Sequence, residues 1–337
     1  MNGRYSRQEL FPPIGKAGQE KIQNSKVAII GAGALGSASA EMLARAGVGH
    51  ITIVDRDYVE WSNLQRQQLY TERDAEEQIP KAEAAKNRLK QINSGITIAS
   101  KVMDIHGMNI EAVIKGHTVI VDASDNFETR LIVNDAAVKQ GIPYIYGACV
   151  GSYGLTYPVI PGQTPCLQCL IDHLPAQGMT CDTAGVISPA VQTTAAYQVT
   201  STLKVITGNS LEAVIQSFDM WNGQHTSIHA RRLLNKNCPA CGKDPSFPYL
   251  NYENLTKTAV LCGRDTVQIR PASHRDLSLE EVSLHLKEAA EKIKVTPYLV
   301  SFIYENHRIV LFKDGRALIH GTNDVSTAKG IYNRIVG

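Results

Sequence analysis

The sequence lacks the features that would place it in several special classes of protein. It has no uninterrupted apolar run near the roughly 18 residues of a membrane-spanning helix, so we expect no membrane segment. Its opening MNGRYSRQEL has no apolar stretch of an export signal, which favours a cytoplasmic protein with reduced thiols. Its net charge is only +2, from 34 basic and 32 acidic residues, so no global charge indicates nucleic-acid binding.

Cysteine is scarce and odd in number. Seven cysteines in 337 residues do not suit a disulfide scaffold, and they favour metal binding or thiol chemistry instead. The hydrophobic fraction of 43% is ordinary, and the length predicts about two domains with a sizeable core. Because the composition changes near Pro245 to Pro248, we place the domains at residues 1–248 and 249–337.

The first domain alternates strand-like and helix-like segments. The strand-like segments are 26–30, 50–54, 96–103, 118–121 and 144–146, and the helix-like ones are 37–46, 81–92, 129–139 and 188–205. Such alternation predicts an α/β fold, with a Rossmann-like, mostly parallel sheet and helices on both of its faces.

The second domain has a different pattern, typical of a small α+β domain. Residues 258–270 are interpreted as one strand interrupted at Gly263. The capping box Ser278-Leu-Glu-Glu281 predicts a helix with Val282, Leu286, Ala289 and Ile293 on its inner side. Further strands are expected at 297–304, 308–312 and 316–320, before a closing helix near 326–335.

A glycine turn joins the first strand to the first helix of the alternating domain. Gly31-x-Gly33-x-x-Gly36 allows phosphate to approach the backbone N–H groups at the helix start. Asp55 follows Gly36 by nineteen residues, at a strand end suited to ribose hydroxyls. The pattern predicts a nucleotide site, and it leaves open whether the nucleotide is ATP or the NAD of a dehydrogenase.

Polar segments follow the next strands. Asp57, Ser62-Asn-Leu-Gln-Arg66 and Lys81 could clamp a triphosphate, or they could form an ordinary solvated loop. Asp122 and Asp125 end a later strand, where open α/β sheets place their ligands, so a carboxylate there could hold magnesium. The alternative for Asp125 is the N-cap of the helix near Thr129.

Two CxxC pairs, Cys166/Cys169 and Cys238/Cys241, predict one structural zinc site, since each turn can present two thiolates to a tetrahedral ion. Free redox pairs are the alternative. Cys181 stands alone among small polar residues and is either a nucleophile or a buried thiol, whereas Cys149 and Cys262 are interpreted as core residues. Near the N-terminus, Tyr5 and Arg7 could simply form an exposed arm.

Taken together, these motifs resemble the MoeB/ThiF family of adenylyltransferases, bacterial relatives of the ubiquitin-activating enzymes, over roughly residues 4 to 245. The resemblance is carried by Arg4-Tyr-Ser-Arg7-Gln, Gly31-Ala-Gly-Ala-Leu-Gly36, Asp55-Arg-Asp57, Ser62-Asn-Leu-Gln-Arg66, Pro80-Lys81, Asp122-Ala-Ser-Asp125-Asn126, both CxxC pairs and Thr180-Cys181-Asp-Thr-Ala-Gly185. Ala34 stands where a family variant has glycine, and its methyl group leaves the backbone N–H in place.

The resemblance implies ATP-dependent adenylation of the C-terminal glycine of a ubiquitin-like sulfur-carrier protein. ThiS, for thiamine synthesis, is preferred to MoaD, for molybdenum cofactor synthesis. A homodimer, Mg²⁺ and Zn²⁺ are implied, with a sulfurtransferase or cysteine desulfurase as a further partner. The implied nucleotide-binding residues are Gly31, Gly33, Ala34, Gly36, Asp55, Asp57, Ser62, Asn63, Leu64, Gln65, Arg66, Lys81, Asp125 and Asn126.

Within this set the resemblance also implies individual roles. Asp55 would hold the ribose, Asn63, Arg66 and Lys81 the phosphates, and Asp125 the magnesium ion. Arg7 would reach a phosphate bound to the other subunit, and Cys181 could become linked to the carrier in ThiF-like members. The rival hypotheses are an NAD-dependent oxidoreductase and a non-catalytic module that binds a ubiquitin-like protein.

Overall fold

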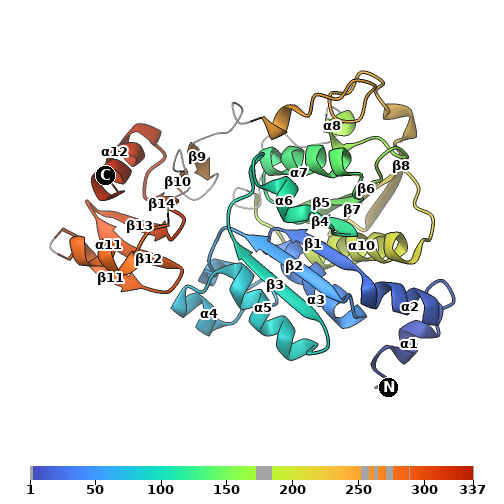
Figure 1. Ribbon diagram of the computed structural model, residues 1–337, viewed down its shortest axis with the longest axis horizontal. Coiled ribbons are helices and arrows are strands. Elements are labelled where there is room, and N and C mark those ends of the chain that lie inside the picture. Colours follow the sequence, from blue (N-terminus) through green and yellow to red (C-terminus); the bar gives the residue numbers. More distant parts are fainter. Residues whose placement is uncertain are drawn as a thin grey trace. The chain divides into compact units, whose positions relative to one another are not determined.

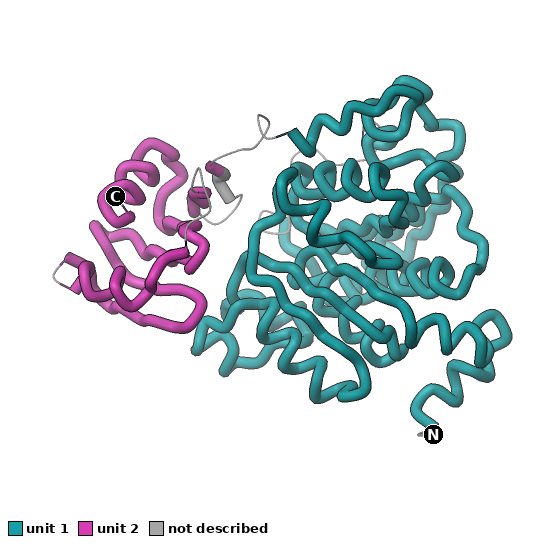
Figure 2. Tube along the Cα trace, viewed as in Figure 1, with its two compact units in different colours: residues 1–254 teal, residues 255–337 magenta. Residues whose placement is uncertain are grey.

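The computed structural model describes residues 3–171, 184–251, 258–261, 265–270, 276–287 and 289–336. The chain divides into two compact units, Met1–Asn254 and Leu255–Gly337, which are considered separately (Figure 2). Within the described residues, no helix combines the length and the apolar character that crossing a membrane requires.

An eight-stranded sheet forms the centre of the first unit, in the order β3-β2-β1-β4-β5-β6-β7-β8 (Figure 1). Its strands are β1 (Lys26–Ile30), β2 (His50–Asp55), β3 (Thr97–Val102), β4 (Val119–Asp122), β5 (Tyr144–Val150), β6 (Tyr153–Val159), β7 (Val214–Asp219) and β8 (Gln224–His229). The pairs from β3 to β5 are parallel, and those from β5 to β8 are antiparallel. The prediction of a mostly parallel sheet is confirmed, although the three strands of its antiparallel side were not predicted.

Helices connect the parallel strands. Among the described residues of the first unit, the α-helices are α1 (Ser6–Glu9), α2 (Gly15–Asn24), α3 (Ala34–Ala46), α4 (Glu72–Glu77), α5 (Lys81–Ile92), α6 (Ile110–Ile114), α7 (Phe127–Gln140), α8 (Leu167–Leu170) and α10 (Ser188–Thr207). Short 3-10 turns are η1 (Gly3–Tyr5), η2 (Trp61–Asn63), η4 (Arg231–Leu233) and η5 (Pro248–Leu250).

Strand β1 shows how both faces of the sheet are covered. Val27 and Ile29 belong to an apolar core that includes α3, α5 and α10. Ala28 and Ile30, which alternate with them, belong to a second core that includes α6 and α7. Because successive side chains of a strand point to opposite faces, a nearly all-apolar strand needs helices on both sides.

The second unit is a six-stranded antiparallel sheet in the order β11-β12-β13-β14-β10-β9. Its elements are β9 (Thr258–Leu261), β10 (Thr266–Ile269), α11 (Leu279–His285), β11 (Glu291–Val295), β12 (Leu299–Tyr304), β13 (His307–Phe312), β14 (Ala317–His320) and α12 (Val325–Val336). Residues of both helices pack with the sheet in one apolar core.

Two predictions for this unit are wrong. Residues 258–270 form two strands, β9 and β10, that pair antiparallel with each other rather than one interrupted strand. Ser278 does cap α11, accepting a bond from the Glu281 N–H, but the helix ends at His285 instead of extending to Ile293. Residues 291–295 pair with β12, so sheet pairing prevails over the helical spacing of the apolar residues.

Candidate functional site

The glycine turn between β1 and α3 is a backbone feature that larger residues could not form. Gly31 has a φ of +97°, and a Cβ placed on it would lie 2.5 Å from the carbonyl oxygen of Ala123. A Cβ on Gly36 would lie 2.0 Å from the carbonyl oxygen of Gly31. The turn therefore packs closely against the segment that follows β4, at the carboxyl edge of the parallel strands.

Asp55, at the end of β2, is bonded directly to this turn. Its Oδ2 accepts the Ala32 N–H at 2.6 Å, and its Oδ1 accepts the Asp57 N–H at 2.7 Å. Burial raises the pKa of the Asp55 carboxyl, while Lys81 and the two N–H donors oppose that rise. An ionised carboxylate can accept about four hydrogen bonds, so capacity remains for ribose hydroxyls.

Lys81, the first residue of α5, lies close to the carboxylates of Asp55 and Asp57. Its side chain is buried, and Nζ lies 3.5 Å from Oδ2 of Asp57. The Lys81 N–H also donates to the Asp57 carbonyl oxygen. Two bonds thus fix Lys81 to Asp57, which follows β2, and bring a buried cation close to the glycine turn.

The loop from Ser62 to Arg66 is shaped by its own side chains. Asn63 is buried, and its Oδ1 accepts the Glu60 N–H at 3.0 Å. Its Nδ2 lies 3.5 Å from Oγ of Ser62, a weak bond. Arg66 Nη1 donates to the Ser62 carbonyl oxygen at 2.8 Å. The described contacts of Asn63 and Arg66 therefore hold the loop, and their contacts with phosphate stay predictions.

Asp122 is buried at the end of β4, and its carboxylate is occupied by protein donors. Oδ1 accepts from both the N–H and the hydroxyl of Ser124, and Oδ2 accepts from the Tyr144 hydroxyl. Burial raises the pKa of Asp122, which Arg130 opposes. These contacts make Asp122 a residue that orders the loop after β4.

Asp125, in contrast, is exposed at the tip of that loop. The N-cap of α7 is Asn126, whose side chain accepts the Thr129 N–H at 2.8 Å, so the alternative that Asp125 caps this helix is wrong. Asn126 Nδ2 donates to Oδ1 of Asp125 at 3.1 Å. The capping residue thus orients the neighbouring carboxylate, which faces outward from a loop packed against Gly31.

Two arginines near this edge were given no role by sequence reasoning. Arg130 donates through Nη2 to the Ser124 carbonyl oxygen, and its guanidinium lies over the rings of Phe127 and Tyr146. Arg56 forms an ion pair of 3.3 Å with Asp104. Burial alone would lower the pKa of Arg56, but Asp104, Asp57 and Asp125 raise it above its ordinary value. No local sequence signal identifies these contacts.

The four cysteines of the CxxC pairs converge, with their Sγ atoms all within 4.8 Å of one another. The Sγ–Sγ distances are 3.9 Å for Cys166 to Cys169, 3.6 Å for Cys166 to Cys238 and 3.4 Å for Cys169 to Cys241. Four Zn–S bonds of about 2.3 Å in a tetrahedron would separate the sulfurs by about 3.8 Å, so the cluster fits a zinc ion.

Neighbouring residues build the two cysteine turns. Asn134 of α7 accepts the Leu167 N–H at 2.8 Å, beside the first pair. In the second pair a Cβ on Gly242 would lie 2.5 Å from the Cys238 carbonyl oxygen, so only glycine fits there. Of the other cysteines, Cys149, predicted as a core residue, is partly buried and packs against the small apolar cluster around Leu35 and Val191. Cys181 and Cys262 lie outside the described residues.

The N-terminal arm is anchored at the far end of α3 from the glycine turn. A Cβ on Gly47, which ends α3, would lie 2.5 Å from Cζ of Tyr5, so the tyrosine ring covers this glycine. Asn93 Nδ2 donates to the Tyr5 hydroxyl, and Gln8 Nε2 donates to the Ala46 carbonyl oxygen. Between these anchors, Arg7 is exposed on α1.

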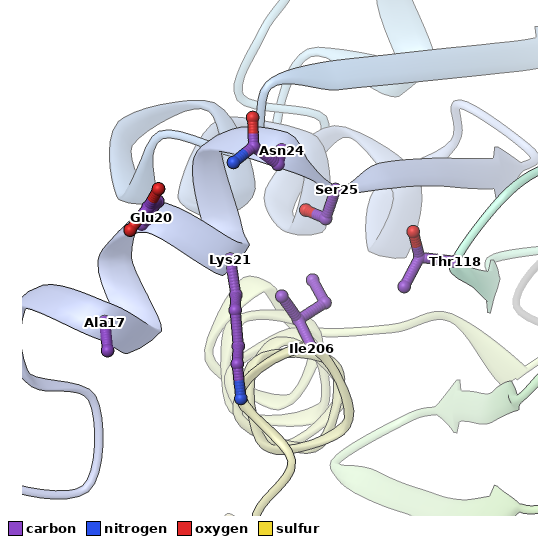
Figure 3. Close-up of a pocket in the computed structure, with 7 residues that line it drawn as sticks. All are labelled: Ala17, Glu20, Lys21, Asn24, Ser25, Thr118 and Ile206. Carbon is purple, nitrogen blue, oxygen red and sulfur yellow. The ribbon is translucent and has the colours of Figure 1, made fainter.

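A cavity of about 520 Å³ lies at the opposite edge of the sheet (Figure 3). Thr118 and Ser25, which line it, precede β4 and β1, so it opens at the amino ends of these strands. Lys21 crosses it to donate to the Thr207 carbonyl oxygen at the end of α10. Of the predicted site residues that the structure describes, none lines this cavity.

Comparison with known proteins adds a second line of evidence. Residues 5–240 match the profile of the ThiF family. The chain is 58% identical to the sulfur carrier protein ThiS adenylyltransferase of Bacillus subtilis over 100% of both chains. It is 35% identical to the enzyme of the same name from Escherichia coli, over 73% of this chain and 97% of the relative. The crystal structure of E. coli MccB with ATP has a TM-score of 0.61 and 25% identity, covering 72% of this chain and 74% of MccB.

Proposed function

The chain belongs to the ThiF family, and from that premise we propose that it uses ATP to adenylate the C-terminal glycine of a ubiquitin-like sulfur-carrier protein. The carrier carboxylate attacks the α-phosphate of ATP, giving an acyl-adenylate and pyrophosphate. The full-length similarity to a ThiS adenylyltransferase supports a ThiS-like carrier and thiamine synthesis. A MoaD-like carrier and molybdenum cofactor synthesis come second.

The observation that carries this proposal is the gathering of charged side chains around the glycine turn. Both reactants are anionic, so the site must supply positive charge and hold the reacting groups in line. Asp55 bonds to the turn itself, and Lys81 lies beside Asp57, which follows it. The loop that ends at Asp125 packs against Gly31.

We assign roles to these residues from the family resemblance together with their positions. Asp55 keeps acceptor capacity for the ribose, while Lys81 and Arg66 contact the phosphates. Asn63 can bond to a phosphate only through Nδ2, because its Oδ1, which accepts from the Glu60 N–H, is an acceptor like the phosphate oxygens. Asp125 is the exposed carboxylate at this edge and would hold a magnesium ion, whose charge would help to neutralise the triphosphate. Asp122 and Arg130 order the loop that carries Asp125.

Arg7 would contribute to the site of the other subunit of a homodimer. Its arm is fixed beside Ala46 and Gly47, whereas the glycine turn lies at the other end of α3. That helix has 13 residues and so spans about 20 Å. Arg7 therefore cannot reach the glycine turn of its own chain, and a partner's turn is the alternative.

The cysteine cluster supports a structural role for zinc. Four thiolates leave no open coordination position, so the ion would join the α8 turn to the Cys238 turn without entering the reaction. Cys181 could capture the activated carrier before a sulfurtransferase or cysteine desulfurase supplies sulfur. We assign no catalytic or binding role to residues 249–337.

The test is ATP/pyrophosphate exchange by the full-length protein with purified ThiS-type and MoaD-type carriers. We expect exchange that requires Mg²⁺ and a carrier, with the ThiS-type carrier more active. NAD(H) binding without exchange would favour an oxidoreductase instead. Carrier binding without exchange would favour a non-catalytic module.

A further inference from the structure

Gln67, the residue after Arg66, is buried with an unpaired amide oxygen. The residue is 3% exposed, and its Oε1 has no hydrogen-bond partner among the described residues. Buried polar side chains are nearly always hydrogen-bonded, and leaving one unpaired costs free energy. Because the unpaired atom is an acceptor, a donor from outside the chain would remove this cost.

The carboxamide lies over the glycine turn. Nε2 of Gln67 is 3.9 Å from the position that a Cβ on Gly33 would take, and apart from the glycine's chain neighbours it is the one described atom within 4 Å. Gly33 is the middle glycine of the turn and the N-cap of α3, a helix of 13 residues. At this position of such a turn the backbone approaches the phosphates of a nucleotide most closely.

Backbone and side-chain bonds hold Gln67 in this place. Its N–H donates to the Asn63 carbonyl oxygen, and its own carbonyl oxygen accepts the Tyr70 N–H. The Tyr70 hydroxyl donates to the carbonyl oxygen of Ala32, next to Gly33. The segment from Gln67 to Tyr70 is thus fixed to Asn63 at one end and to the glycine turn at the other.

We propose that Gln67 is a further nucleotide ligand, whose carboxamide donates an N–H bond to a phosphate oxygen lying over Gly33. This inference rests on the proposed function. It adds a neutral hydrogen-bond donor to the cations, Lys81 and Arg66, that the proposed function places at the phosphates. The two ends of an amide exchange places by rotating half a turn, so Gln67 can present a donor whichever way it points. A phosphate oxygen cannot satisfy the amide oxygen, because both are acceptors, so that oxygen accepts from water at the bound nucleotide.

The adjacent Gln68 provides a matched control. It is exposed, its Nε2 donates to Glu41 at 2.9 Å, and its Oε1 accepts from Gln192. The two residues have the same type of side chain. They differ because both the amide nitrogen and the amide oxygen of Gln68 are hydrogen-bonded to described residues, whereas the oxygen of Gln67 is unpaired. Gln91, exposed on α5 and bonded to Arg88, controls for the addition of one negative charge.

The experiment measures Mg·ATP and adenosine affinities of the full-length protein by calorimetry. We expect Gln67→Met to weaken Mg·ATP binding about 10-fold and Gln67→Glu about 100-fold, because the latter places a carboxylate against phosphate. Adenosine affinity should change less than about twofold in both, as should Mg·ATP affinity in Gln68→Met and Gln91→Glu.

Two results would overturn the inference. One is Mg·ATP affinity within twofold of wild type in both Gln67 variants. The other is an equal loss of adenosine and Mg·ATP affinity, which would make Gln67 a merely structural residue. If Gln67→Glu fails to fold, judged by its melting curve, Gln67→Met alone decides. Failure of the wild-type protein to bind Mg·ATP would instead count against the proposed function itself.

Discussion

The position of the N-terminal arm makes a quantitative prediction about mixed dimers. Arg7→Ala removes the cation that each subunit would lend to its partner, and Asp125→Ala removes the carboxylate proposed to hold magnesium. Each homodimer should lose on the order of 100-fold or more of its exchange activity, because one charge at the reacting phosphate is missing from both sites.

In a dimer of one Arg7→Ala and one Asp125→Ala subunit, the outcome depends on which chain supplies the arginine. If Arg7 acts across the interface, the Arg7→Ala subunit keeps Asp125 and receives an intact arginine, while the other site lacks both groups. Since a two-fold dimer has two equivalent sites, about half of the wild-type activity should return.

The assay co-expresses the two variants with different affinity tags, purifies the mixed dimers through both tags and measures carrier-dependent ATP/pyrophosphate exchange. Mixed dimers as inactive as their parents would show that the arginine acts within its own chain. A protein that stays monomeric at assay concentrations would also refute the reasoning.

Three other changes have defined outcomes. Gly36→Ala should prevent tight Mg·ATP binding, because a Cβ there would meet the Gly31 carbonyl oxygen at 2.0 Å, and wild-type affinity in isothermal calorimetry would contradict this. Burial raises the pKa of Asp135 to about 6 from its ordinary 3.8, so its ionisation destabilises the folded state as the pH rises through that interval. The free energy of unfolding of Asp135→Asn, relative to wild type, should therefore increase by about 1.4 kcal/mol between pH 5 and pH 8 in urea titrations, whereas a pH-independent difference would argue against the shift. Removing zinc with a chelator should lower the melting temperature in calorimetry, and an unchanged curve after verified metal loss would rule out a structural ion.

Local sequence signals were sufficient for the glycine turn and the cysteine cluster. At Gly31 and Gly36 a Cβ would collide with nearby backbone atoms, so both positions require glycine. The spacing of these glycines between a strand and a helix is therefore enough to predict the turn. Two CxxC pairs likewise predict convergence although sixty-eight residues separate Cys169 from Cys238, because a tetrahedral ion needs both.

Signals that depend on distant partners were missed or misread. Residues 286–293 carry apolar residues at helical spacing, and only pairing with β12 shows that Glu291–Val295 is a strand. Asp125 and Asn126 are both good N-cap residues, so the sequence could not decide between them. Gln67 carries no motif of its own, and its significance depends on Gly33, more than thirty residues earlier in the chain.

The most direct test of the account is the product itself. The full-length protein is incubated with ATP, magnesium and a purified ThiS-type or MoaD-type carrier. Mass spectrometry then shows whether that carrier has been adenylated. The account predicts that the C-terminal glycine of the ThiS-type carrier gains one AMP, and that this product is lost with Asp125→Ala. Intact ATP and unmodified carriers, from a folded and zinc-loaded protein, would contradict it.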